Sequence, residues 1–326
     1  MNIDVVLGCI AVLGCAAVVH AAPAEDGTIT KSFQVAAGGR LLLETDRGTI
    51  DIRPVDTPTR LDVEVRDATG MTVEFTQHGA DVQIHGKATG GFWRWLWSRQ
   101  FWRGPQFVVT VPHQYNVDLR TSGGAITVGD LEGEVRSRTS GGSIHLGRIR
   151  GPVSGETSGG SIRIAESIHS AEVKTSGGSI QVDTVEGEVI ACTSGGAIHI
   201  GKATGRVVAE TSGGGITVQE AGSAITATTS GGAVMVGLAG QPQDDSRLQT
   251  SGGSVVVLLA ETIGLDIDAR TSGGRVTTEL LVTVQGEFST TALQAKMNAG
   301  GPKLVLRTSG GDIAWASCAD SGGGHT

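Results

Sequence analysis

The residues best suited to contact another molecule are gathered in one stretch, GGFWRWLWSRQFWRGP, at residues 90–105. Four of the five tryptophans in the chain lie there among arginines. Tryptophan settles at a membrane–water boundary while arginine meets anionic head groups. Both residue types also dominate the hot spots of protein interfaces, and tryptophan rings stack on sugars. The predicted binding residues are Trp93, Arg94, Trp95, Trp97, Phe101, Trp102 and Arg103.

The same stretch has a structural interpretation. Its apolar area is large for a solvated loop, so these side chains could instead fold back and cover the flank of a neighbouring domain. Glycines on both sides indicate an insertion between two strands in either case. The sequence leaves both interpretations open.

Carboxylate pairs are the second class of residues that could do chemistry. Glycoside hydrolysis needs two carboxyl groups about 5–9 Å apart, and Glu132 with Glu134, or Asp244 with Asp245, could provide them. Both pairs lie in turn or strand-surface contexts that are typical of solvated charge. The sequence contains no nucleophile elbow, phosphate loop or CxxC motif. We therefore predict that the chain is not an enzyme, with a carbohydrate-active β-helix enzyme (lyase or hydrolase) as the alternative.

Metal, cofactor and nucleic-acid binding are disfavoured. His145 and His199 occupy the same column of the repeat described below, but three coils separate them, about 14 Å at strand spacing. They cannot share a metal ion, and the glycine-rich repeats lack the aspartates of a calcium roll. We expect no cofactor. A net charge of −8 argues against nucleic-acid partners.

The element that must position all these residues is a repeat. The tetrapeptide Thr-Ser-Gly-Gly recurs every 18 residues and then at longer steps of 21 and 37. A fixed period of this length is the signature of a stacked repeat architecture. The repeats start at Thr121, Thr139, Thr157, Thr175, Thr193, Thr211, Thr229, Thr250, Thr271 and Thr308.

Each repeat contains two short strands. The sixth and eighth positions, such as Ile180 and Val182, are apolar around a polar seventh, which predicts a half-buried strand. A second apolar column at the fifteenth position predicts another strand in the same unit. The Gly-Gly pair is expected to supply a positive φ at a sharp corner. Alternation from the sixth position predicts that the serine of each TSGG points inward and the threonine outward.

We therefore predict an all-β fold, a single-chain β-solenoid of about 18-residue coils with an irregular β-rich N-terminal cap region. Residues 27–115 form the cap with the insert at 90–105, residues 116–316 form the solenoid, and residues 317–326 form a disordered tail. Thr45 to Ile52 have the register of a degraded TSGG coil. The Asn298–Gly301 segment is expected to mark a second coil within the last long step.

Residues 1–22 have the character of a signal peptide, because a short apolar run ends in small residues before Ala22. The leader lacks Lys and Arg and carries Asp4. Two alternatives remain: Cys15 follows a lipobox-like sequence, which would make a lipoprotein, or the leader is retained as an anchor. Each alternative places the protein in the periplasm or cell envelope.

The TSGG units, the GGRLLLETDRGTIDI segment, the DLRTSGG junction and the closing GGPKLVLRTSGGDI together resemble a bacterial "putative adhesin" β-strand-repeat family of unknown function. The resemblance covers residues 30–316 and implies a β-solenoid in an exported bacterial protein. It does not extend to the aromatic insert. The interpretation that follows is a non-catalytic envelope scaffold or adhesion-like binding module. Its expected partner is a membrane surface, an envelope protein or a glycan.

Overall fold

The repeat folds into coils because its apolar positions alternate along strands. In β16 (Ile180–Val185), Ile180 and Val182 are buried while the residue between them faces outward. Ile180 lies opposite the corresponding isoleucine of the coil before and of the coil after, so the column is continuous. Stacked in this way, coils too small to bury a core alone share one. The predicted β-solenoid is confirmed.

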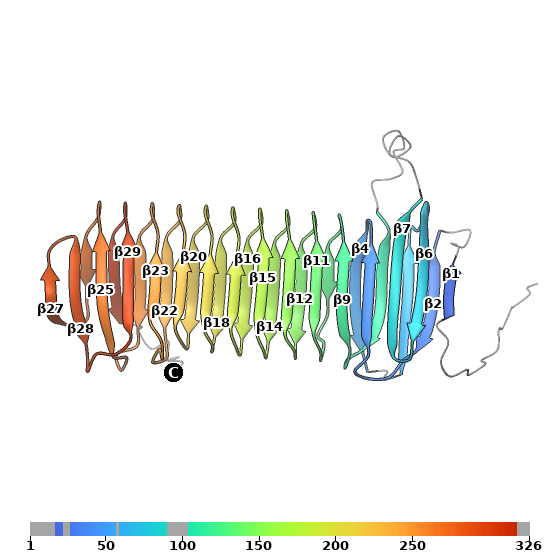
Figure 1. Cartoon of the computed structure of the whole chain (residues 1–326), viewed down its shortest axis with the longest axis horizontal. Coiled ribbons are helices and arrows are strands. Elements are labelled where there is room, and N and C mark those ends of the chain that lie inside the picture. Colours follow the sequence, from blue (N-terminus) through green and yellow to red (C-terminus); the bar gives the residue numbers. More distant parts are fainter. Residues whose placement is uncertain (1–16, 22–26, 57–58, 90–103, 318–326) are drawn as a thin grey trace, which may run out of the picture.

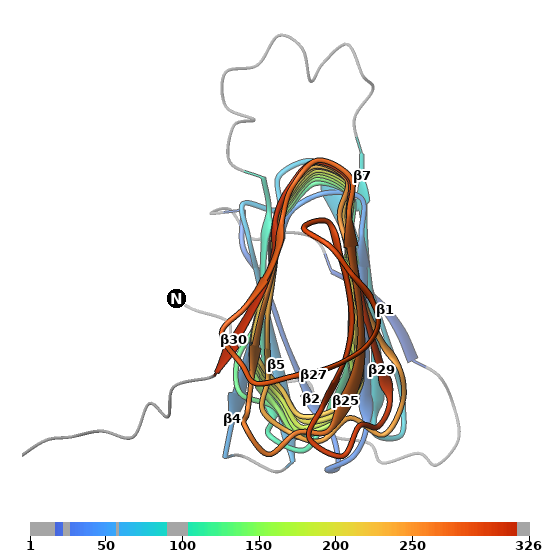
Figure 2. The same cartoon turned by 90° about the vertical axis from the view of Figure 1, so that its left-hand side faces the viewer.

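The computed structural model describes residues 17–21, 27–56, 59–89 and 104–317, which form two long sheets facing each other across a single core (Figures 1 and 2). In spatial order the first sheet contains β1 (Ala17–Ala21), β6 (Met71–His78), β7 (Asp81–Ala88), β3 (Arg40–Thr45), β9 (Asn116–Thr121), β11 (Val135–Thr139), β13 (Val153–Thr157), β15 (Ala171–Thr175), β17 (Val189–Cys192), β19 (Val207–Glu210), β21 (Ile225–Thr228), β23 (Ser246–Gln249), β29 (Lys303–Thr308), β25 (Leu265–Thr271), β28 (Ala292–Met297) and β27 (Thr283–Phe288). The second contains β2 (Ile29–Gln34), β5 (Arg60–Arg66), β8 (Gln106–Pro112), β4 (Thr49–Val55), β10 (Ile126–Val128), β12 (Ile144–Ile149), β14 (Ile162–Ser167), β16, β18 (Ile198–Ala203), β20 (Ile216–Ala221), β22 (Val234–Leu238), β24 (Val255–Leu259), β30 (Ile313–Ser317) and β26 (Val276–Thr278).

The N-terminal strands continue the stack. Thr45 pairs with Thr121 and Ile50 with Ile126, so β3 and β4 form a coil in register with the repeats, as the sequence predicts. Beyond that coil, β7 and β8 form another, and β2, β5 and β6 pair antiparallel to their neighbours. Parallel stacking gives way to antiparallel strands where the regular repeat is absent.

The order of coils in space departs from their order in the chain at both ends. The β3–β4 coil lies between the β7–β8 coil and the first TSGG coil. At the other end, β29 lies between β23 and β25, and β30 lies between β24 and β26. The last coil in sequence, formed by β29 and β30, is therefore inserted between the β23–β24 coil and the β25–β26 coil.

Two expectations about the TSGG corner are wrong. The threonines are buried and the serines exposed, the reverse of the predicted orientation. From Thr139 onward each threonine hydroxyl makes two bonds: that of Thr175 donates to the carbonyl of Gly160, the second glycine of the adjacent corner (2.8 Å), and accepts from the N–H of Gly178 in its own corner (3.3 Å). Strict alternation fails here because the chain turns between the threonine and the next strand.

The corner glycines do not adopt positive φ either. The second glycine is required because successive corners stack closely: a Cβ on Gly178 would lie 2.0 Å from the carbonyl oxygen of Gly160. The Asn298–Gly301 segment is also not a TSGG-type corner. It is the turn between β28 and β29, with positive φ at Asn298, Gly300 and Gly301, and it stacks on Gly264 at the opposite edge.

Candidate binding surfaces

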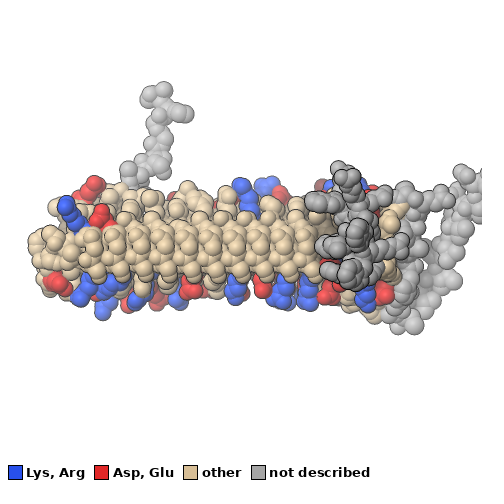
Figure 3. Space-filling model, turned by 90° about the horizontal axis from the view of Figure 1, so that it is seen from above, with Lys and Arg blue, Asp and Glu red and all other residues tan. Residues whose placement is uncertain are grey.

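The stacked TSGG corners form a ridge along one edge of the molecule, hereafter the TSGG ridge. Its exposed residues are the serine and the first glycine of each corner, so it carries no charged side chain (Figure 3). Its main-chain groups bond between coils, as Gly159 N–H does to the Ser140 carbonyl (3.0 Å). What it offers a partner is a row of serine hydroxyls repeated at strand spacing, about 4.8 Å. The ridge is therefore a narrow strip without charge.

The aromatic insert leaves the fold at the N-terminal end of this ridge. It follows β7 and precedes β8, and both of its described flanks are anchored to neighbouring corners. Thr89 N–H donates to the Gly70 carbonyl (2.8 Å), and Thr49 N–H donates to the Pro105 carbonyl (3.0 Å). A Cβ added to Gly48 would lie 2.4 Å from that same Pro105 oxygen, so Pro105 stacks directly on the degraded corner.

The predicted binding residues lie outside the described part of the chain. Trp93, Arg94, Trp95, Trp97, Phe101, Trp102 and Arg103 all fall within residues 90–103. Only Gly104 and Pro105 of the insert are described, with Gly104 exposed and Pro105 buried. The described residues Thr89 and Pro105 therefore fix only where the chain leaves and re-enters the sheets.

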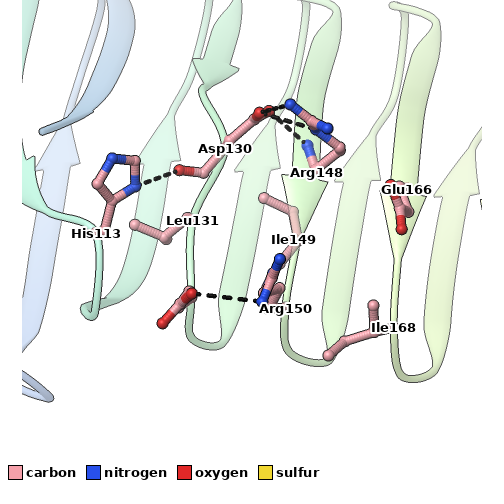
Figure 4. A pocket seen from close by; sticks show the side chains of 9 residues that line it. His113, Asp130, Leu131, Arg148, Ile149, Arg150, Glu166 and Ile168 are labelled. Atoms are coloured by element: carbon pink, nitrogen blue, oxygen red, sulfur yellow. Dashed lines mark hydrogen bonds and ion pairs between the residues drawn. The ribbon is translucent and has the colours of Figure 1, made fainter.

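A hollow of about 320 Å³ lies at the opposite edge, where β8, β10, β12 and β14 end. His113, Asp130 and Glu132 line it together with Arg148 and Arg150 (Figure 4). Asp130 accepts from the Arg148 side chain and main-chain N–H (both 2.9 Å), and Glu132 lies 3.7 Å from Arg150. The carboxylates and guanidinium groups largely neutralise one another. This arrangement joins successive coils and leaves no free carboxylate pair.

The carboxylate pairs considered from the sequence do not converge on one site. Glu132 accepts from Gln114 (3.1 Å) in this hollow, whereas Glu134 pairs with Arg136 (2.7 Å) in a separate one. Asp244 is exposed, and Asp245 accepts from the main-chain N–H of Lys303 (2.8 Å) at the start of β29. Glu132 and Glu134 are therefore paired surface groups, Asp244 is a solvated one, and Asp245 aligns the start of β29.

Asp130 and Glu64 are two carboxyl groups that arginine partners keep ionised. The main-chain and side-chain hydrogen bonds from Arg148 hold the pKa of Asp130 below its usual range. A hydrogen bond from Arg66 does the same for the pKa of Glu64. A glycosidase requires one carboxyl group with a raised pKa to act as general acid. The lowered pKa keeps Asp130 and Glu64 ionised, so neither of these two groups is suited to act as that general acid.

The two histidines stand where the repeat predicts. His145, Arg163, Gln181 and His199 occupy successive levels of one outward column. The histidines are therefore three coils apart and cannot share a metal ion. Within residues 17–21, 27–56, 59–89 and 104–317, no group of three or more His, Cys, Asp or Glu side chains gathers as a metal site would require.

A family model described as Toastrack DUF4097 matches residues 40–315, which is most of the chain. The chain belongs to this family. The match confirms the predicted resemblance to a family of unknown function and covers both the N-terminal coils and the TSGG repeats of this Toastrack chain. No match was found among curated proteins.

Three solved structures similar to this Toastrack chain are described as cell-adhesion proteins or adhesins. A "putative adhesin" from Bacteroides fragilis shares 12% identity with a TM-score of 0.39, covering 90% of this chain and 98% of that one. One from Parabacteroides distasonis shares 13% identity with a TM-score of 0.33, covering 89% and 98%. A "putative cell adhesion protein" from Clostridium sporogenes shares 10% identity with a TM-score of 0.21, covering 89% and 99%. In the described part of the Toastrack chain, no helix has the length and apolarity needed to cross a bilayer.

Proposed function

We propose that this chain is a non-catalytic binding module or scaffold of the bacterial cell envelope that contacts its partner through the aromatic insert. The observation that carries the proposal is that both sheets are complete without the insert. β7 pairs with β3 and β6, and β8 pairs with β4 and β5, so neither strand needs a partner from residues 90–103. The sheets therefore assign no pairing role to residues 90–103, which supports a role in contact with a partner.

The N-terminal end of the core also supports this role. The rings of Phe33 and Phe75, one from each sheet, lie 5.9 Å apart and are buried with Leu61 and Val73. These described strands cover their own core. The tryptophans of the insert are therefore less needed as a cover, which was the competing interpretation of the sequence.

The partner that best fits the insert is an anionic membrane surface. Trp93, Trp95, Trp97 and Trp102 would enter the interface, and the interspersed arginines would meet phosphate groups. An envelope protein or a glycan would use the same residues through hot-spot contacts or ring stacking. The carbohydrate-active enzyme is the alternative, and the arginine-paired carboxylates of the described surface support the non-catalytic function over it.

The test replaces the four tryptophans with serine and measures co-sedimentation with vesicles containing anionic lipid, alongside capture from envelope fractions. We expect vesicle binding to fall at least tenfold while the melting temperature stays at the wild-type value. A Met235→Ser variant is the control, because Met235 is exposed on a side face far along the stack. Early melting of the tryptophan variant, with no binding by wild type, would show that the insert is a cover and would end the proposal.

Export is the second part of the proposal and rests on residues 1–22. β1 lies within this leader and pairs antiparallel with β6, so cleavage before Ala22 would remove β1 and leave β6 as the edge strand. Mass spectrometry of the mature N-terminus tests it. A chain starting at Ala22, or a lipid-modified chain starting at Cys15, supports export to the envelope. An intact Met1 in a cytosolic fraction contradicts it.

A further inference from the structure

The C-terminal end of the solenoid carries the largest exposed apolar side chains of the described residues. Leu281 is 97% exposed and Phe288 is 76% exposed, and Val284 lies on the strand between them. All six residues of β27 are exposed, and β27 is the outermost strand of its sheet (Figures 1 and 2). Large apolar groups clustered at an open edge mark an interaction site.

These side chains belong to the core face of the sheet. In the antiparallel pair with β28, Val284 lies opposite Ala295 and Phe288 opposite Leu293, and both of those partners are buried. Residues directly opposite in an antiparallel pair point to the same face. Val284 and Phe288 therefore continue the core beyond its last covered level.

The edge has only part of the usual protection, because a charge and an irregular pairing with β28 are its sole protective features. β27 contains neither lysine nor proline, and its only charge, Glu287, is paired with Arg270 at 3.5 Å. Natural edge strands are commonly blunted by lysine, proline or a covering segment. The pairing with β28 is irregular between Val284 and Phe288, but the outer edge of β27 has no strand partner among the described residues.

The strand TVQGEF is complementary to itself in one antiparallel register. A two-fold axis at Gly286 places Val284 opposite Phe288 of a second copy on one face. On the other face it places Gln285 opposite Glu287, an amide donor against a carboxylate. No like charges meet, and the apolar pair joins the open core of each copy. Such self-complementarity is what an isologous two-fold interface requires.

We propose that two copies of this chain associate tail to tail through β27, extending the sheet across the interface. Sedimentation velocity of the full chain over a range of concentrations tests it. We expect a monomer–dimer equilibrium in which Phe288→Lys raises the dissociation constant at least tenfold. Phe288 is mostly exposed in the single chain, so this variant should keep the wild-type melting temperature when monomeric.

The matched control is Met235→Lys, which introduces the same charge at an exposed apolar residue (46% exposed) away from the end. It should leave the dimer unchanged. A wild-type chain that stays monomeric at every concentration overturns the proposal. So does a dimer that survives Phe288→Lys, because that dimer would use another surface.

A cross-linking experiment tests the register. In a chain whose four native cysteines are replaced by serine, one preparation carries Gln285→Cys and another Glu287→Cys. Directly opposed residues lie about 4.5–5.5 Å apart at Cα, within disulfide range. We expect a mixed disulfide to form fastest in the equimolar mixture. Equal or faster linking of either variant alone would contradict pairing centred on Gly286.

Discussion

At the scale of single residues, the two glycines of each TSGG corner have different roles. A Cβ on Gly177 would come no closer than 3.5 Å to a neighbouring atom, whereas a Cβ on Gly178 would lie 2.0 Å from the Gly160 carbonyl oxygen. We predict that Gly178→Ala lowers the free energy of unfolding by about 1–3 kcal/mol through overpacking. Gly177→Ala should change it by less than about 0.5 kcal/mol. Urea unfolding of both variants provides the measurement, and equal effects would contradict the stacking argument.

The threonine and serine of the corner show where residue-level prediction from sequence fails. Alternation correctly places Ile180 and Val182 in the core because both lie on one strand. It fails across the corner, where Thr175 turns inward as well, because a turn between the two strands resets the alternation. Serine therefore forms the exposed face of the TSGG ridge, although alternation from the sixth position predicts that it points into the interior.

At the scale of elements, the inserted strand β29 is held on one side by an ion pair. Arg307 lies 2.6 Å from the carboxylate of Asp268 on β25 and donates to the Asp268 carbonyl (2.6 Å). Burial alone would raise the pKa of Asp268, but the hydrogen bonds and charges of Arg307 and Arg270 outweigh it and hold that pKa below its usual value. The folded chain thus favours the ionised carboxylate.

The sign of the pH dependence follows from the lowered pKa. The pair stabilises the fold above the unfolded-state pKa of about 3.9 and loses this contribution as pH falls through the lower folded-state value. We predict that Asp268→Asn is less stable than wild type at neutral pH and that the difference shrinks below about pH 4. Urea unfolding at both pH values measures this difference, with the exposed Asp244→Asn as control. A difference independent of pH would contradict the assignment.

The sequence identifies the coils but not the order in which all of them stack. The TSGG marker is the same in every coil. It therefore predicts the corner and the core columns but does not specify which coil stacks on which. For the evenly spaced repeats from Thr121 onward, the order along the chain predicts the stacking order, because the short connections allow each coil to stack only on the one before it. The 37-residue step before Thr308 is long enough for the chain to form β27 and β28 and return between existing coils. The exposed Leu281 and Phe288 arise in that same excursion.

At the scale of the whole molecule, stability depends on contacts between neighbouring coils, because no coil has a core of its own. Ile180 is buried in a central coil, so Ile180→Asp places an unpaired charge in a dry interior. We predict a loss of at least about 3 kcal/mol in the free energy of unfolding and loss of circular-dichroism signal over several coils. His145→Asp, on the outward column of the same sheet, is the control. An unchanged melt for Ile180→Asp would show that the register of the core is wrong.

Local opening should follow the order of strands in space rather than in the chain. Strands β29 and β30 come last in the described sequence, yet each is hydrogen-bonded to a neighbour on both sides. β27 precedes them but pairs on one side only, with β28. We predict slow amide hydrogen exchange in residues 303–308 and 313–317, comparable to β23 and β24, and fast exchange in residues 283–288. Hydrogen exchange should be measured in the Phe288→Lys variant, because a tail-to-tail dimer would itself slow the exchange of the β27 amides. Fast exchange throughout residues 303–317 would mean that the chain frays from its C-terminal strands, which the insertion of β29 and β30 between two neighbouring coils should prevent.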